Sequence, residues 1–104
     1  MAIPGFILDK RGDVAALCRR THARRLDLFG SASRDDFRPD RSDLDFVVAF
    51  DLLPPADYSD AFFSLKEGLE ALFDRPVDLL TERSLRNPYL RKRVDAERVA
   101  VYGA

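Results

Sequence analysis

The sequence predicts a small α/β (α+β) domain, with a mixed β-sheet of about four strands on which helices pack. The chain has 104 residues, which is enough for one hydrophobic core but too few for two. Apolar residues make up 46% of it and charged residues 34%, a balance typical of ordinary globular proteins. Short β-type runs alternate with segments of helical periodicity. We therefore expect residues 1–104 to form a single domain.

The N-terminal part of the chain predicts a helix followed by a strand. Helical spacing relates Val14, Leu17, Cys18 and Thr21, with arginines on the other side, so we expect a helix over about residues 13–24. Residues 25–29 partly alternate between polar and apolar side chains and stop at a Gly-Ser pair. This pattern is typical of a short strand that enters a tight turn.

A polar segment and a strongly apolar segment come next. Residues 31–42 contain Pro39 and several Asp and Ser residues that favour turns, so we expect a loop with at most a short helix at its start. Residues 44–50 form an almost continuous apolar run rich in Val and Phe. Such a run indicates a strand that is covered on both faces or lies at the centre of a sheet.

The second half of the chain predicts helix, strand, helix and strand. Apolar residues from Tyr58 to Leu72 recur at three- and four-residue steps after a Pro-Pro pair, which indicates the longest helix. Residues 77–81 favour a strand, Asn87-Pro88 is typical of a helix start, and residues 99–102 favour a last short strand.

The charge balance argues against a general nucleic-acid-binding protein. The 17 Lys and Arg residues stand against 18 Asp and Glu residues, so the formal net charge is −1 and no overall positive field attracts nucleic acid or anionic lipid. One basic cluster before the Gly-Ser pair suits either a solvated helix face or the attraction of phosphate, and a second cluster near the C-terminus suits a solvated face. Their members are Arg19, Arg20, Arg24 and Arg25 in the first cluster, and Arg91, Lys92 and Arg93 in the second.

Hydropathy and cysteine content predict the compartment. No segment has the length of a membrane span or the apolar stretch of a signal peptide. Cys18 is the single cysteine, which excludes a disulfide within the chain and agrees with a reducing environment. We therefore expect a cytoplasmic protein that does not bind membranes.

Two aspartates at the start of the apolar strand are candidates for metal binding. Asp43 and Asp45 are two residues apart, so in a strand their carboxylates point to the same face, within reach of a shared cation. Paired carboxylates with open coordination positions suit hard ions such as Mg²⁺ or Mn²⁺, which keep water and substrate phosphates as their other ligands. An EF-hand is excluded because its loop glycine is absent and an apolar strand follows.

The Gly-Ser pair predicts an anion site beside these aspartates. Gly30 lets the backbone approach a ligand, Ser31 supplies a hydroxyl, and backbone N–H groups at such a turn bind anions. Asp78 adds a third carboxylate at the head of the next strand, where neighbouring strands converge. An anion site next to a divalent-cation site is what a nucleoside triphosphate bound with its metal requires.

This set of motifs resembles a known superfamily. Gly30-Ser31, then Asp43-x-Asp45, then Asp78 look like the signature of the DNA polymerase beta-like nucleotidyltransferases. Length and element order are similar to the smallest branch, the minimal nucleotidyltransferases, and to the antitoxin half of HEPN/minimal nucleotidyltransferase toxin-antitoxin pairs. The likeness covers nearly the whole chain, and it implies the nucleotidyltransferase palm fold.

The resemblance implies catalytic roles for the three aspartates. Asp43 and Asp45 would be ligands of two divalent ions. Asp78 would be a further ligand of the catalytic ion, near the attacking hydroxyl. The implied cofactor is Mg²⁺, as two ions, with Mn²⁺ as the alternative.

The resemblance also implies a nucleotide-binding loop. Gly30 and Ser31 would hold the triphosphate. Arg34 matches an arginine that often follows the Gly-Ser turn, and it would either contact phosphate or pin the loop to Asp35 or Asp36, since arginine suits both tasks. Two features depart from the family pattern: Asp35 replaces the usual glycine, and the loop that leads to Asp43 is one residue longer.

The implied function is that of an enzyme, a protein adenylyltransferase. It would transfer AMP from ATP to a hydroxyl of a partner protein, expected to be a tyrosine of a HEPN-domain toxin, and would act as an antitoxin in a hetero-oligomer. Direct binding to nucleic acid is not expected. Two alternatives stay open: a non-catalytic antitoxin that neutralises its toxin by direct binding, which the Asp35 and loop departures favour, and a transferase for small molecules of the aminoglycoside type. The second alternative is disfavoured because no substrate-binding domain follows the palm.

Overall fold

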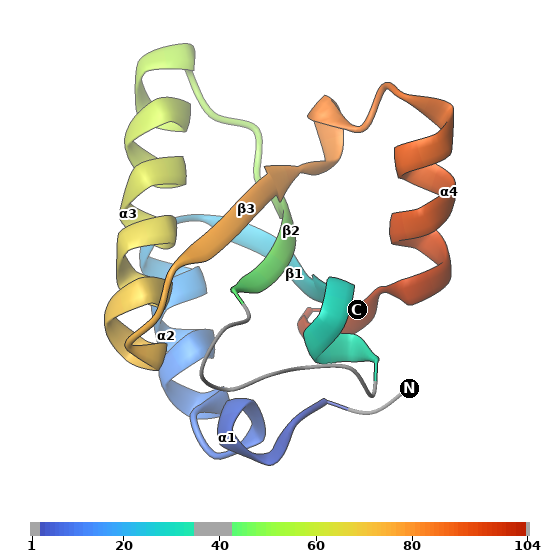
Figure 1. Cartoon of the computed structure of the whole chain (residues 1–104). Coiled ribbons are helices and arrows are strands. Elements are labelled where there is room, and N and C mark those ends of the chain that lie inside the picture. Colours follow the sequence, from blue (N-terminus) through green and yellow to red (C-terminus); the bar gives the residue numbers. More distant parts are fainter. Residues whose placement is uncertain (1–2, 35–42, 104) are drawn as a thin grey trace.

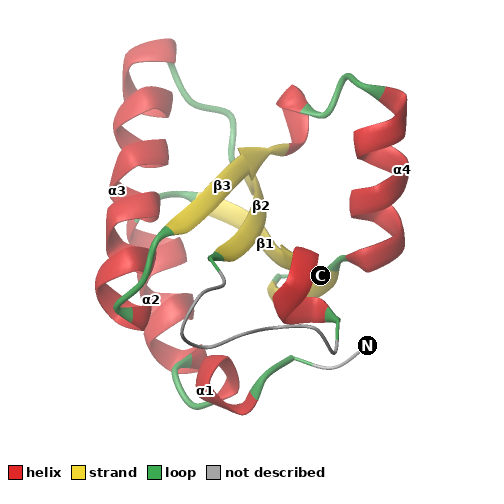
Figure 2. Cartoon of the chain, viewed as in Figure 1, coloured by secondary structure: helices red, strands yellow, loops and turns green. Residues whose placement is uncertain are grey.

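A four-stranded sheet with helices on both faces forms the protein (Figures 1 and 2). The computed structural model describes residues 3–34 and 43–103. In chain order, its elements are α1 (Gly5–Leu8), α2 (Arg11–Arg20), β1 (Ala23–Phe29), the 3-10 helix η1 (Gly30–Ser33), β2 (Leu44–Phe50), α3 (Pro55–Phe73), β3 (Val77–Thr81), the 3-10 helix η2 (Glu82–Ser84), α4 (Pro88–Glu97) and β4 (Val99–Tyr102).

The sheet is mixed, as the sequence predicts. Its strand order is β3-β2-β1-β4, so β1 and β2 are the central strands. β1 runs antiparallel to both of its neighbours, whereas β2 and β3 are parallel. The apolar run of β2 is explained by this position, because both faces of the strand are covered along most of its length.

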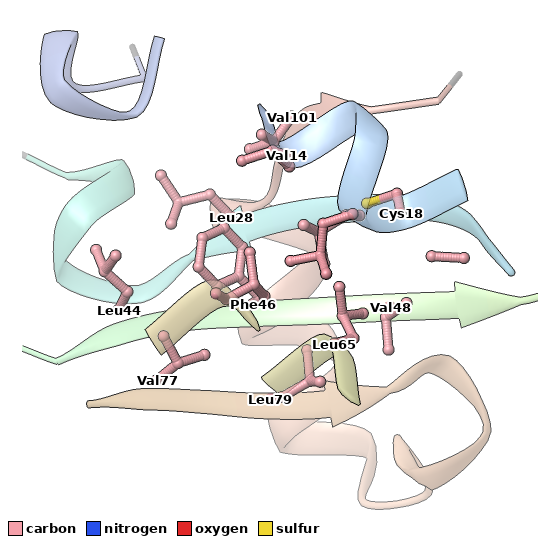
Figure 3. Packing of buried hydrophobic residues seen from close by; sticks show 14 of the residues in the cluster. Val14, Cys18, Leu28, Leu44, Phe46, Val48, Leu65, Val77, Leu79 and Val101 are labelled. Atoms are coloured by element: carbon pink, nitrogen blue, oxygen red, sulfur yellow. The ribbon is translucent and has the colours of Figure 1, made fainter. Parts of the chain in front are cut away.

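A large hydrophobic core lies between the sheet and the first three helices. Figure 1 shows α1, α2 and α3 on one side of the sheet and α4 on the opposite side. Side chains of β1, β2 and β3 that point toward α2 and α3 meet the apolar faces of these helices (Figure 3). The labelled members of this cluster are Val14, Cys18, Leu28, Leu44, Phe46, Val48, Leu65, Val77, Leu79 and Val101.

A smaller core lies under α4 on the other face of the sheet. Val94 of α4 is fully buried and packs with Phe29 of β1, Val47 of β2 and Leu85. Asp45 pairs with Asp78 in the sheet register, and Val47 pairs with Leu80 two residues further along the strands. Since side chains alternate between the two faces of a strand, Asp45 and Asp78 lie on the same face as Val47 and Leu80, the face that α4 covers.

Helix ends largely follow the predicted signals. α3 begins with Pro55 and ends where Asp74 adopts a left-handed backbone with a φ of 51°. Asn87 caps α4, because its side-chain Oδ1 accepts hydrogen bonds from the backbone N–H groups of Tyr89 (2.9 Å) and Leu90 (3.3 Å). Within the described residues, no helix has both the length and the apolar character that crossing a membrane requires.

The predicted helix over residues 13–24 is wrong at both ends. α2 starts at Arg11 and ends at Arg20, and β1 starts at Ala23. The helix stops early because His22 takes a φ of 62°, a conformation that no helix continues. The single-turn helix α1 was not predicted, because it buries one residue, Ile7, and so has no repeating apolar pattern.

Candidate active site

A sharp turn at the end of β1 begins the site. Gly30 has a φ of 73°, which favours glycine, and a Cβ atom at this position would lie 2.1 Å from Oδ2 of Asp45. Glycine is therefore required twice, by the backbone conformation and by the carboxylate packed against it. Ser31, half-buried, follows in η1, and the hydroxyl of Ser33 donates to the carbonyl oxygen of Gly30 at 2.9 Å.

Sheet pairing brings the predicted aspartates next to this turn. Asp45 is the register partner of Phe29 on β1 and of Asp78 on β3. Asp43 lies directly before β2 and is exposed, as is Asp78, whereas Asp45 is half-buried. The topology thus gathers the three carboxylates and the Gly-Ser turn at one edge of the α4 face.

The charge of Asp45 is disfavoured by its surroundings. Burial, together with the neighbouring charges of Asp78 and Asp43, raises the pKa of its carboxyl group to about 6, and the positive charges of Arg93 and Arg34 partly oppose this rise. Three carboxylates close enough to repel one another favour a cation in their midst.

The chemistry of this donor set fits a hard divalent ion, since all three candidate ligands are carboxylates. In the described part of the chain, no group of three or more His, Cys, Asp or Glu side chains is already arranged to hold a metal ion. Asp43 and Asp78 are exposed, so an ion can reach their carboxylates from solvent.

α4 contributes two residues that the sequence did not single out for the site. Glu97 accepts a hydrogen bond from the backbone N–H of Gly30 at 3.0 Å and forms an ion pair with Arg34, with 2.5 Å between its Oε2 and Nη1 of the arginine. Arg93 lies 3.6 Å from the same Oε2. The four-residue spacing of Arg93 and Glu97 was visible in the sequence, but nothing there connects Glu97 to a turn 67 positions away.

One contact of Arg34 is an ion pair with a residue that the sequence analysis did not consider. Its ion pair with Glu97 anchors the end of η1 to α4. The other predicted partners, Asp35 and Asp36, lie outside the described residues, as do most of the longer loop and the departure at Asp35.

The first basic cluster lies away from this site. Arg24 and Arg25 lie near the beginning of β1, where Arg25 is the register partner of Ala49 near the end of β2, whereas Gly30 follows the other end of β1. Arg25 forms an ion pair with Asp27 (2.9 Å). The interpretation of this cluster as a phosphate attractor is therefore not supported by the fold.

Comparison with known proteins gives the family. Residues 14–101 match the family model described as the nucleotidyltransferase domain. Two Methanocaldococcus jannaschii proteins named as protein adenylyltransferases are 35% and 34% identical to the chain over 74 residues. The match covers 71% of this chain and 72% and 71% of those relatives. The chain belongs to the nucleotidyltransferase domain family.

Solved structures agree with this assignment. The nucleotidyltransferase resembles a minimal nucleotidyltransferase with 37% identity and a TM-score of 0.69, over 89% of this chain and 90% of that one. A toxin-antitoxin structure with AMP-PNP gives 28% identity and a TM-score of 0.66, over 90% and 73% of the two chains. A complex of a tri-AMPylated Shewanella oneidensis HEPN toxin with its MNT antitoxin gives 25% identity and 0.63, over 94% and 73%.

These findings confirm the predicted fold class and class of enzyme. The protein is a nucleotidyltransferase with the mixed four-stranded sheet of its structural neighbours. Nucleotidyltransferases of this superfamily generally use divalent metal ions.

Proposed function

We propose that this nucleotidyltransferase transfers AMP from ATP to a hydroxyl group of a HEPN-domain toxin, and that it acts as the antitoxin of that toxin. The observation that carries the proposal is the sheet register that places Asp45 beside Asp78 and against Gly30. The similarity to the AMP-PNP-bound toxin-antitoxin structure and to the complex with a tri-AMPylated toxin supports the donor and the partner. A cytoplasmic location and the absence of direct nucleic-acid binding belong to the same proposal.

The three aspartates would hold the metal. Asp43 and Asp45 would bind two divalent ions, Mg²⁺ or Mn²⁺, and Asp78 would bind one of them from the neighbouring strand. When bound, such ions neutralise phosphate charge and lower the pKa of a coordinated hydroxyl group. Asp78 is exposed, so an acceptor side chain brought by another protein can reach it.

The turn after β1 would hold the phosphates. The Ser31 backbone N–H and hydroxyl are donors suited to phosphate oxygens, Gly30 lets the backbone approach the phosphates while its own N–H donates to Glu97, and Arg34 adds a positive charge. In the reaction, the acceptor oxygen forms a bond to the α-phosphorus, the bond from that phosphorus to pyrophosphate breaks, and the acceptor proton leaves beside Asp78. The expected acceptor is a tyrosine of the toxin.

Mass spectrometry of the partner protein tests this function. The protein encoded by the neighbouring gene is incubated with the nucleotidyltransferase, Mg²⁺ and each of the four nucleoside triphosphates, and its intact mass is measured. We expect a gain of AMP with ATP and no gain with the Asp43→Asn/Asp45→Asn double variant. A stable complex without any mass gain would instead indicate an antitoxin that acts by binding alone. If neither a mass gain nor a complex is seen, the result contradicts the proposed partner and favours the alternative of a small-molecule acceptor.

A further inference from the structure

α4 covers the face of the sheet on which the candidate active site lies. Val94 is fully buried against Phe29 and Val47, the residues that flank the Asp45 position on β1 and β2. Figure 1 shows α4 on this side of the sheet, and α4 contacts η1. The packing of Val94 therefore fixes the position of α4, and with it the positions of Arg93 and Glu97, relative to the Gly-Ser turn.

Glu97 gathers three donors at the end of this helix. One carboxylate oxygen accepts from the Gly30 backbone N–H, and the other lies near both Arg34 and Arg93. The Glu97 side chain is only 14% exposed. A partly buried carboxylate in this position keeps the turn and both guanidinium groups together.

Two arginines converge on one carboxylate oxygen of Glu97. Arg34 and Arg93 share a single oxygen of Glu97, at 2.5 Å and 3.6 Å, so their guanidinium groups lie close to each other. Their side chains are 37% and 57% exposed, which lets a ligand reach them. Both also act on Asp45, whose pKa they lower, so both lie within Coulombic range of the candidate metal ligands.

The neighbouring arginines of the same region have different tasks. Arg91 donates to the backbone carbonyl oxygens of Leu85 (3.2 Å) and Glu82 (3.3 Å), which fixes the connection before α4. Arg98 pairs with Asp27, Glu82 and Asp95. Arg93 differs from both because its ion pair lies beside the Gly-Ser turn.

We propose that Arg93 is a phosphate-binding residue of the active site, held beside Arg34 by Glu97, and that the triphosphate of the donor nucleotide is its ligand. The proposal rests on the nucleotidyltransferase function proposed above. A triphosphate offers several oxygens to two adjacent guanidinium groups, and each guanidinium can donate two hydrogen bonds to it. Glu97 is then a positioning residue, since it acts through Gly30, Arg34 and Arg93.

Calorimetric titration of the full chain with Mg²⁺-ATP and with inorganic triphosphate tests this role. Arg93→Gln is compared with Lys92→Gln, which makes the same charge change at the adjacent exposed position of α4. We expect Arg93→Gln to weaken binding of both ligands by about tenfold or more, as the loss of a charge-assisted hydrogen bond does, and Lys92→Gln to leave binding unchanged. Arg93→Lys should restore part of the affinity, because it keeps the charge but loses the paired donors.

The outcomes separate this inference from the proposed function. If the wild type binds Mg²⁺-ATP and Arg93→Gln binds both ligands as tightly as Lys92→Gln does, the role of Arg93 is wrong and the proposed function stands. If the wild type binds neither ligand, both proposals are wrong. Titrating at about pH 8 keeps Asp45 ionised in every variant, so a changed carboxylate charge cannot imitate the loss of the arginine.

Discussion

Asp45 is held where its own negative charge is unfavourable. Its pKa is raised to about 6 by burial and by the charges of Asp78 and Asp43, so the folded chain binds this proton more tightly than the unfolded chain does. Without metal, stability therefore falls as the pH rises from about 4 to about 6, and the destabilisation is fully present above that range.

Asp45→Asn removes this unfavourable charge and should stabilise the metal-free protein. We expect a gain of about 1 kcal/mol near pH 7.5, a value reduced for the half-exposed side chain, and little gain near pH 4.5, measured by urea unfolding in a chelator. Equal gains at the two pH values would contradict the assigned cause. The same variant should lose transferase activity, because Asp45 is a proposed metal ligand.

Gly30 is fixed by two independent constraints. Gly30→Ala places a Cβ atom in a left-handed backbone conformation and against the Asp45 carboxylate, so we expect a loss of at least about 1 kcal/mol in unfolding free energy and of most activity. Gly12→Ala is the matched control: Gly12 lies in α2, and a Cβ atom there meets nothing within 4 Å. That variant should be as stable as the wild type or more so.

At the level of elements, a buried ion pair joins β1 to the end of α4. Asp27 is fully buried and accepts hydrogen bonds from Arg98 at 2.7 Å and from Arg25 at 3.0 Å. The Arg98 side chain is 13% exposed and that of Arg25 is 40% exposed. The same carboxylate therefore has a mostly buried partner, Arg98, which we call the inner partner, and a more exposed one, Arg25, the outer partner.

Removing the inner partner should be far more damaging than removing the outer one. Arg98→Ala leaves the Asp27 charge buried with its exposed partner alone and should cost about 3 kcal/mol or more, whereas Arg25→Ala should cost less than about 1 kcal/mol. Thermal or urea unfolding of the two variants measures this difference. Similar costs would mean that water reaches Asp27 and that the pair does not anchor α4.

The elements that the sequence predicted correctly are those whose pattern depends on their own residues. The apolar run of β2 and the apolar residues at helical spacing in α3 are the residues that are buried or partly buried in the fold. Asn87-Pro88 predicts the start of α4 because Asn87 caps the helix through local hydrogen bonds. The end of α2 was missed because it depends on the backbone of His22, a residue with no strong turn preference.

The candidate site divides in the same way. Gly30, Asp43, Asp45 and Asp78 were predicted together because their positions at strand ends and their spacing indicate a shared site, and the structure brings them to one edge of the sheet. The sequence did not connect Glu97 and Arg93 to this turn, because their contacts there depend on the packing of α4 across β1 and β2, which no local pattern encodes. Arg93 in the sequence is only one member of a basic cluster on a helix.

For the molecule as a whole, the distribution of charge matters more than its sum. The formal net charge is −1, yet three aspartates meet at one edge of the sheet, where their repulsion acts against the folded state. A divalent ion that binds only the folded chain removes this repulsion and stabilises the fold through linkage. Metal binding is therefore measurable as stability, independently of any transfer reaction.

Mg²⁺ should raise the melting temperature of the wild type and leave that of Asp43→Asn/Asp45→Asn almost unchanged. At ten times the dissociation constant, linkage predicts about 1.4 kcal/mol, which is roughly 5–10 °C for a domain of this size. The quantity to compare is the shift on adding Mg²⁺, because the double variant starts from a higher melting temperature once two repelling charges are gone. Equal shifts in melting temperature for the wild type and the double variant would mean that the ion binds elsewhere. Arg93→Gln should keep the wild-type shift, because Arg93 is proposed to bind phosphate rather than the ion.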